Sequence, residues 1–454
     1  MTQVQGTKAE DFFDPTFGNG GVLDLPFEGI FGRIPNSVLP LPDKKLLLLF
    51  SALASENSPV KVARLNEDGS RDLPFGNNGI VEVPFKDGAL FSGRHLRLLP
   101  SGGWLITGTL EYPDGVVDLA VVRHLQNGQL DTSFGPEKDG KVALNVYDLI
   151  DSRAEPGAGF VTRRHDEKSA EKSSVSAGDV GVVAVGQQDG KIVLVSTVFF
   201  AFDCLRGIAV RLNTDGSLDA TFNGKGFVLV ELPGVTHNWN YAAGVAVQQD
   251  GKVLVCGDFS RENPEGRPDA YVIRYDQYGN VDESYGDNKN GAVTITDSSR
   301  WLDLFSMTLK ADGGVLAVGT AESGGHREGL IASLNPNGSF NLVFNNGKPL
   351  FSNLTEHGVS WRNCVLQTDG KLVVSGQGGR ALVNENSSVV TARYAPDGSL
   401  DVKFAGKGWA VFNNESGIDL FRGCTVMADN RIVVSGYVSF APPPLPGYVV
   451  RYLA

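Results

Sequence analysis

The sequence predicts an all-β fold, a seven-bladed β-propeller made of four-stranded antiparallel blades. Three observations predict it: one kind of turn recurs seven times, each copy carries four short runs of Val, Ile and Leu, and no segment shows helical periodicity. The aromatic anchors of the turns are Phe17, Phe75, Phe134, Phe222, Tyr285, Phe344 and Phe404. Their spacings are 58, 59, 88, 63, 59 and 60 residues, so the third interval holds an insertion.

The four runs of each copy, named A to D in chain order, are expected to be strands. Run A follows the aromatic turn, as at 79–85 and 226–232. Runs B and C flank a polar turn such as Asp250-Gly251, and an Asp-Gly pair between two apolar runs is a strong hairpin signal. Run D, as at 209–212, is followed by another turn. This is the pattern of a propeller blade, whereas a parallel β-helix has shorter rungs.

The two chain ends complement one another. The last run, 447–453, stops where the next Asp-Gly turn is due, and the N-terminus resumes the unit at Phe13-Asp-Pro-Thr-Phe17. Run B is small and apolar, as an innermost strand needs, whereas run A alternates. We therefore expect the N-terminal run A to join the last, C-terminal blade as its outer strand and close the ring. The alternative, with A to D in one blade, lacks this closing strand.

These features divide the chain into a tail at 1–12 and a single propeller domain at 13–454, with an inserted polar loop at about 148–179. The insertion falls in an A to B connection. It is rich in mixed charges and poor in core-forming residues, which is typical of a solvated loop. The functional alternative is a flap over the mouth of the central pore.

The repeated motifs resemble those of a known family. The Asp-x-Ser/Thr-Phe-Gly turn, the Asp-Gly-Lys hairpin and the segment Arg211 to Asp219 are similar to the delta-60 repeat, a bacterial propeller-forming unit of unknown function. The resemblance covers Phe13 to Leu453 except for the insertion. It implies a propeller and no particular activity. Members of the family are mostly large secreted or surface proteins with further domains, and this sequence has neither such a domain nor an evident export signal.

Composition excludes several classes of protein. With 41% hydrophobic and 20% charged residues the chain can bury a large core, and 56 Gly predict many tight turns. The formal net charge is −12 without a basic cluster, which disfavours nucleic acid as a partner. No apolar run is long enough for a membrane span, and the polar N-terminus lacks the pattern of a Sec signal. A cytoplasmic location and export by a route without an N-terminal signal both remain open.

The repeated polar residues are expected to be structural, because seven copies of one residue cannot form one active site. The turn residues Asp14, Asp72, Asp131, Asp219, Asp282, Asn341 and Asp401 are placed for Asx turns, and an ion pair with the Arg of run D is a further option. The aromatic anchors are expected to be wedges between blades. Calcium bound by the Asp-Gly-Ser-Leu-Asp loops is a lesser alternative, since these lack a dense run of oxygen ligands. We predict no cofactor and no metal, and four free thiols.

Unrepeated residues collect on one rim, where the A to B and C to D loops emerge. Exposed aromatic rings beside polar groups suit the stacking of a sugar or a peptide, although each Trp could instead fill a gap between blades. The candidate ligand-binding residues are Trp239, Trp301, Trp361, His237, Arg300, Glu356, His357 and Arg422. A three-histidine metal site of His237, His326 and His357 is a minor alternative.

The leading functional hypothesis is a non-enzymatic propeller that binds a glycan or a protein partner through this irregular rim. The main rival is a glycan-cleaving or lactone-type hydrolase with Glu356, His357 and His326 as acid and base at the pore mouth. A third hypothesis is a structural or toxin-like component associated with the envelope. No nucleophile elbow, phosphate loop or dinucleotide fingerprint is present to support an enzyme class.

Overall fold

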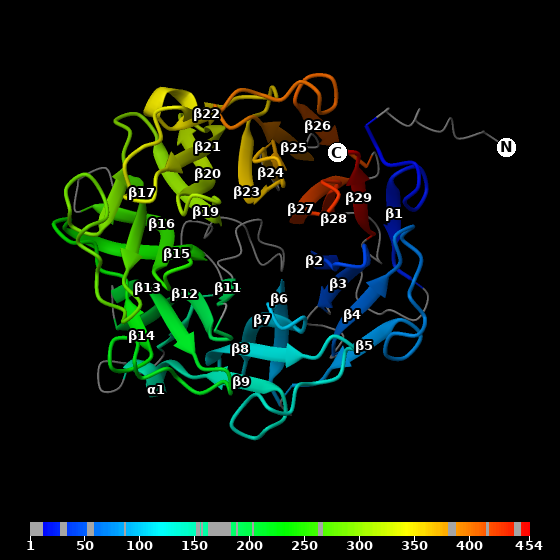
Figure 1. Cartoon of the computed structure of the whole chain (residues 1–454), viewed down its shortest axis with the longest axis horizontal. Coiled ribbons are helices and arrows are strands. Elements are labelled where there is room, and N and C mark those ends of the chain that lie inside the picture. Colours follow the sequence, from blue (N-terminus) through cyan, green and yellow to red (C-terminus); the bar gives the residue numbers. More distant parts are fainter. Residues whose placement is uncertain are drawn as a thin grey trace.

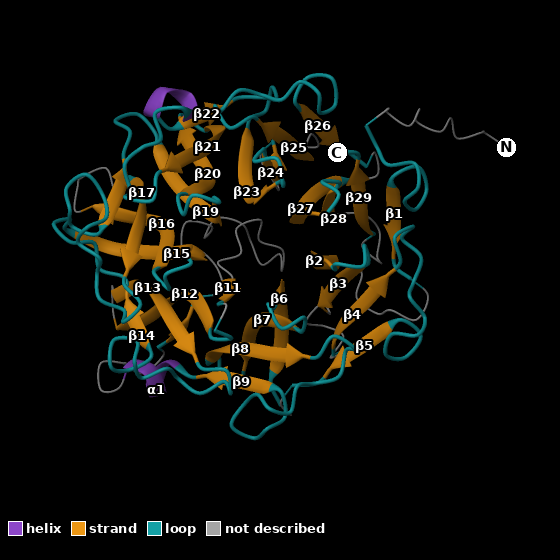
Figure 2. Cartoon of the chain, in the orientation of Figure 1, coloured by secondary structure: helices purple, strands orange, loops and turns teal. Residues whose placement is uncertain are grey.

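Seven antiparallel sheets surround a central axis in the computed structural model (Figure 1), which confirms the predicted fold class. The structure describes residues 12–27, 34–51, 59–85, 88–150, 155, 158–161, 183–187, 189–201, 204–261, 267–379, 387–414, 417–439 and 446–454. Apart from one short α-helix and one 3-10 turn (Phe344–Gly347), the regular structure in these residues is strand (Figure 2). No helix among them has the length and apolar composition of a membrane span.

Each blade runs from an innermost strand to an outermost strand in chain order. Blade 1 holds β2 (Ile34–Pro40), β3 (Leu46–Ser51), β4 (Val60–Leu65) and β5 (Ile80–Val83). Blade 2 holds β6 (Leu90–Leu98), β7 (Trp104–Glu111), β8 (Val117–His124) and β9 (Lys141–Leu144). Blade 3 holds β10 (Gly159–Phe160), β11 (Val183–Gly186), β12 (Ile192–Ala201), β13 (Cys204–Leu212) and β14 (Phe227–Leu229).

The remaining blades repeat the same order. Blade 4 holds β15 (His237–Val247), β16 (Val253–Arg261), β17 (Pro268–Tyr275) and β18 (Ala292–Ile295). Blade 5 holds β19 (Trp301–Leu309), β20 (Val315–Ser323), β21 (His326–Leu334) and β22 (Leu350–Ser352). Blade 6 holds β23 (Val359–Leu366), β24 (Leu372–Gly378), β25 (Ser388–Tyr394) and β26 (Trp409–Phe412). Blade 7 holds β27 (Ile418–Val426), β28 (Ile432–Ser439), β29 (Gly447–Tyr452) and the N-terminal β1 (Val22–Leu25).

The N-terminal strand closes the ring. β1 pairs with β29 in antiparallel register, with Val22 opposite Val450 and Leu25 opposite Gly447, and the two strands lie side by side in Figure 1. The backbone N–H of Asp14 also donates to the carbonyl of Arg451 at 2.9 Å. Run A is therefore the outermost strand of the preceding blade, as expected, and the alternative grouping is wrong.

Blade 3 departs from the regular pattern at the insertion. Helix α1 (Val146–Ile150) occupies the start of the region expected to be a polar loop, because Val146, Leu149 and Ile150 form a short buried helical stripe. β10 and β11 then share the inner edge of β12. Residues 151–154, 156–157 and 162–179 of the predicted insertion, and residues 1–11 of the predicted tail, lie outside the described residues.

The repeated Asp, Arg and aromatic residues form one structural unit in six blades. In blade 3, Arg211 Nε donates to Asp219 Oδ2 at 2.6 Å, and the guanidinium lies 4.5 Å from the centroid of the Phe222 ring. The equivalent ion pairs are Arg64–Asp72, Arg123–Asp131, Arg274–Asp282, Arg393–Asp401 and Arg451–Asp14. Both the predicted Asx turns and the predicted ion pairs are present. The carboxylates are therefore engaged by the protein, which leaves the calcium alternative without support.

The same unit joins each blade to the next. Arg211 Nη1 donates to the carbonyl of Gln277, and the N–H of Asn223 donates to the carbonyl of Tyr278, both at 2.6 Å and both across the boundary between blades 3 and 4. Gly279 follows with φ +84°, and a Cβ there would lie 3.0 Å from the ring of Phe222. The anchors are buried, so they are wedges between blades as expected.

Blade 5 lacks all three charged members of this unit. Ser333 replaces the Arg, and Asn341 replaces the Asp. Gly314 stands where the hairpins of blades 1, 3, 4 and 6 have a Lys that reaches the Asp. Phe344 stays buried in its place. Because a buried charge without its partner is costly, the loss of all three charges together is physically consistent.

Candidate functional site

Two of the three predicted Trp residues stand at matching places on the irregular rim. Trp239 lies near the start of β15 and Trp301 begins β19, so they come from neighbouring blades. The side chain of Trp301 is 47% exposed. Trp239 is partly buried and meets Tyr241 edge-on, with ring centroids 5.2 Å apart. The rim therefore offers one accessible ring and the edge of another.

A fixed cation directly precedes Trp301 in the chain. Arg300 Nε donates to Glu328 Oε2 at 2.7 Å, and Arg300 Nη1 lies 3.3 Å from Asp297 Oδ2. The guanidinium also covers the Phe351 ring at 4.5 Å. The hydrogen bond to Glu328 raises the pKa of Arg300 further. These contacts fix a planar polar group at the rim, on the residue before Trp301.

His237 supports the loop that carries Trp239. Its Nδ1 lies 3.0 Å from the carbonyl of Val235, and its Nε2 lies 2.9 Å from the side-chain amide of Asn240. The amide also donates to the carbonyl of Val230 at 3.0 Å. Because both ring nitrogens are occupied, this histidine orders the loop and is poorly placed to meet a ligand.

Trp361 does not form the expected exposed shelf with the other two. It is fully buried between blades 5 and 6, and a Cβ added to Gly329 of β21 would lie 2.1 Å from its Nε1. Six innermost strands in the described part of the chain contain a β-bulge. Trp239 and Trp301 each lie four positions before the bulged residue of their strand, whereas Trp361 lies one position before it. Trp361 is thus deeper in the ring, where it fills the gap between blades.

The remaining rim candidates are dispersed. Glu356 and His357 are exposed in the turn before β23, and His326 is exposed at the start of β21. Gly358 packs against the backbone of Arg327, so the loops of His326 and His357 are neighbours. No group of three or more His, Cys, Asp or Glu side chains in the described part of the chain could hold a metal ion, so the three-histidine site is not formed.

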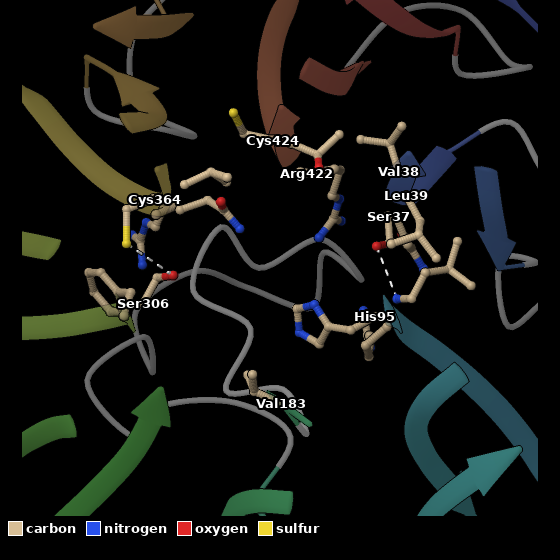
Figure 3. Close-up of a pocket in the computed structure, with 18 of the residues that line it drawn as sticks. Ser37, Val38, Leu39, His95, Val183, Ser306, Cys364, Arg422 and Cys424 are labelled. Carbon is tan, nitrogen blue, oxygen red and sulfur yellow. Dashed lines mark hydrogen bonds between the residues drawn. The ribbon is translucent and has the colours of Figure 1, made fainter. Parts of the chain in front are cut away.

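Arg422 belongs to a central cavity rather than to the rim. The cavity has a volume of about 270 Å³ and is lined by the innermost strands (Figure 3). The residue left over at each bulge lines it; these residues are Asn36, Arg94, Ala243, Phe305, Arg362 and Arg422. Figure 3 shows the side chains of Arg422 and His95 directed into the cavity from different blades. A bulge interrupts the regular alternation of side chains and turns one of them toward the cavity. The residue type at this position differs from blade to blade, although the backbone is the same.

Most of these cavity residues were not predicted from the sequence, although the spacing to the hairpin turn could have identified them. Each bulged residue stands eight positions before the turn residue with positive φ, which is Lys44, Gly102, Gly251, Gly313, Gly370 or Asn430. Counting back from the hairpin turns identifies Arg94, Arg362 and Arg422 as equivalent.

The four cysteines are free, as predicted. Cys364 and Cys424 occupy equivalent positions in the cavity lining, where burial raises the pKa of each thiol to about 12.

One buried carboxyl on β27 predicts a pH-dependent stability. Burial raises the pKa of Asp419 to about 7, although its Oδ2 accepts a 2.7 Å hydrogen bond from the backbone N–H of Asn414. Between the ordinary aspartate pKa of about 4 and pH 7, the folded state therefore holds a proton that the unfolded state has lost, and stability falls as pH rises. Asp419→Asn should remove this loss. The melting temperature of the variant minus that of the wild type should therefore be larger at pH 8 than at pH 5. Equal shifts at both pH values would contradict the assignment.

A family model for a β-propeller repeat agrees with the fold. A family model described as "Domain of unknown function (DUF5122) beta-propeller" matches residues 99–134, 187–222, 248–285 and 367–404. Four of the seven repeats match this family. Each matched segment ends on an aromatic anchor, namely Phe134, Phe222, Tyr285 or Phe404. The resemblance to the delta-60 repeat is compatible with this match. No curated protein matches the chain significantly.

The solved structures that resemble this chain share little of its sequence. A polysaccharide lyase of family PL25, an ulvan lyase, has 12% identity and a TM-score of 0.48, with 95% of this chain and 96% of that chain covered. An α-L-arabinanase from Penicillium chrysogenum has 12% identity and a TM-score of 0.43, with 82% and 95% covered. A protein of unknown function from Dyadobacter fermentans has 13% identity and a TM-score of 0.42, with 95% and 100% covered. At these values no ligand or residue role is transferred.

Proposed function

We propose that this protein is a non-catalytic binding propeller that takes a glycan on the irregular rim of blades 4 and 5. The observation that carries the proposal is the 47% exposed ring of Trp301 on the rim. Arg300, the residue before it in the chain, is held in place by Glu328 and Asp297. An accessible aromatic face supports a sugar ring, and oriented charged groups bond to its hydroxyls. Trp239 adds an aromatic edge at the equivalent place of the neighbouring blade.

The rigidity of this surface also favours binding. Arg206 donates to Glu231 at 3.1 Å and to the carbonyl of Asn238 at 2.7 Å, so the loop before Trp239 is fixed. Arg267 Nη1 donates to the carbonyl of Ser298 at 2.8 Å, which ties a loop of blade 4 to the loop that precedes Trp301. A preorganised surface loses less conformational entropy when a ligand binds.

Trp301→Ala should weaken glycan binding about tenfold or more, the effect of removing a central aromatic contact. A glycan array would identify the oligosaccharide that the wild type binds best, and isothermal titration calorimetry would compare the variants with that oligosaccharide. Trp409→Ala is the matched control, because Trp409 lies on the outermost strand β26 beneath Lys407. The proposal fails if the wild type binds no glycan, or if Trp301→Ala binds as well as Trp409→Ala.

A further inference from the structure

We propose that the glycan bound at Trp301 is electrically neutral, a sugar chain without carboxylate, sulfate, phosphate or amino groups. This inference rests on the glycan-binding function proposed above and names the class of ligand that the same surface would take. The observation behind it is that a carboxylate and a guanidinium stand together as an ion pair on the face of the sheet that carries the exposed ring. A surface with paired charges favours hydroxyl groups over a ligand that carries its own charge.

A row of three partly exposed side chains crosses blade 5 at the rim. Trp301 of β19 lies directly opposite Glu322 of β20, and Glu322 lies directly opposite Arg327 of β21. Residues opposite one another on antiparallel strands point to the same face of the sheet, with Cβ atoms about 5 Å apart. Arg327 Nε donates to Glu322 Oε2 at 3.0 Å, and each of these two side chains is 34% exposed. The ion pair therefore shares one face and one end of the sheet with the ring of Trp301.

This row faces blade 6, the next blade in the ring (Figure 1). Thr320 lies on the same face of β20 as the ion pair, and its hydroxyl forms a hydrogen bond with that of Ser360 on β23. The turn before β23 also approaches the row, because a Cβ added to Gly358 would lie 2.4 Å from the carbonyl oxygen of Arg327. The exposed residue Glu356 belongs to the same turn. A sugar chain that stacks on Trp301 would therefore extend across the boundary of blades 5 and 6.

The ion pair matches the hydrogen-bonding character of sugar hydroxyls. A hydroxyl both donates and accepts, so neighbouring hydroxyls can donate to the Glu322 carboxylate and accept from the Arg327 guanidinium. An anionic group would meet the carboxylate of Glu322 at close range, and that carboxylate already offsets the charge of Arg327. A cationic amino sugar would meet the guanidinium in the same way. The ring of Trp301 supplies the apolar platform for the carbon face of the sugar.

The wider charge distribution agrees with a neutral ligand. Three further arginines on the rim of blades 3 to 5 each form an ion pair: Arg300 with Glu328, Arg261 with Asp269, and Arg206 with Glu231. The whole chain carries a formal net charge of −12, which repels an anionic ligand at long range. Neither the charges of this rim nor the overall charge therefore attracts an acidic glycan.

A glycan array and calorimetric titration with the full chain test the class of ligand. The probes include matched oligosaccharides that differ in charge: cellohexaose against its C6-carboxylate form, and β-1,4-mannohexaose against hexamannuronate. A neutral sugar should bind at least about tenfold more tightly than its acidic counterpart, and its affinity should change less than about twofold between about 0.05 and 0.5 M NaCl. Preferential binding of acidic or amino sugars that is lost in Trp301→Ala overturns the neutral class and leaves the glycan-binding function intact. The absence of binding to any sugar on the array overturns both.

Two charge variants should move the preference for the neutral sugar in opposite directions. Glu322→Gln leaves Arg327 without its carboxylate partner, so the preference over the acidic counterpart should shrink about threefold or more. Arg327→Gln leaves the carboxylate uncompensated, so the preference should grow while the neutral sugar itself binds more weakly. Glu82→Gln is the matched control, because Glu82 forms a cross-strand ion pair with Lys61 on the outer strands of blade 1. An equal preference in the wild type and both variants contradicts a role of the ion pair in binding and overturns the inference.

Discussion

Arg211→Ser is expected to lower the free energy of unfolding by about 3–5 kcal/mol, the cost of breaking a buried ion pair by removing one partner. The two side chains of the pair are only 4% and 3% exposed, so solvent screens it weakly. The hydrogen bonds that Arg211 donates to Thr221 and across the blade boundary to Gln277 are lost as well. Urea denaturation measures the change. Arg327→Ser is the control, because its ion pair with Glu322 is 34% exposed on both sides, and its expected effect is below about 1 kcal/mol.

Blade 5 shows which further substitutions should compensate for the loss of Arg211. Because it carries Ser333, Asn341 and Gly314 at the three charged positions, the triple variant Arg211→Ser, Asp219→Asn, Lys191→Gly reproduces a combination that the same ring already contains. Burial raises the pKa of Asp219, but hydrogen bonds from Thr221 and Lys191 and the charge of Arg211 outweigh it and lower that pKa. The triple variant should therefore recover a large part of the stability lost in Arg211→Ser. If it is as unstable as the single variant, the cost does not arise from an uncompensated charge.

Trp361→Ala is expected to destabilise the protein by about 3–5 kcal/mol, as other large-to-small substitutions in cores do. The indole is fully buried among Val318, Ile331 and Val359 at the boundary of blades 5 and 6. Trp301→Ala is a control of the same residue type, and its cost should be about 1 kcal/mol or less because the ring is already 47% exposed. Chemical denaturation of both variants measures the difference. Similar losses in the two would contradict the assignment of Trp361 to the core.

The partner of Trp361 gives an independent check. Gly329→Ala should cost about 1–3 kcal/mol, because the new Cβ would lie 2.1 Å from the indole nitrogen and the packed ring has little room to move. Combining it with Trp361→Leu should cost less than the sum of the two single changes, since the smaller side chain makes room for the methyl group. Strict additivity would show that the two residues do not contact one another.

Much of the ring was predictable because its signals are local. The Asp-Gly hairpins, the alternation of run A and the aromatic turns each depend on a few consecutive residues, and their sevenfold repetition makes errors in one copy unimportant. Ring closure by β1 was also predictable, since the two chain ends complete one repeat. Helix α1 was not anticipated, because a single buried turn at 146–150 is too short to show periodicity.

The functional residues were predicted less well, because their placement depends on contacts between blades. Trp361 lies three positions closer to the bulge of its strand than Trp239 and Trp301 do, and this offset puts it in the core while the rings of Trp239 and Trp301 stay at the rim. Arg422 appeared to be a loop residue in sequence, and it lines the central cavity together with Arg94 and Arg362.

The amino-acid order alone thus establishes how many blades there are, where their turns lie and how the ring closes, because these follow from short-range hydrogen bonding and alternation. The tertiary structure decides which unrepeated side chains share one surface or one cavity, because folding brings seven distant segments together in a ring. Arg94 and Arg422 are more than 300 residues apart in the chain and still line the same 270 Å³ space. No local pattern encodes that proximity, because it arises from the closed geometry of the ring and the bulge register of each innermost strand.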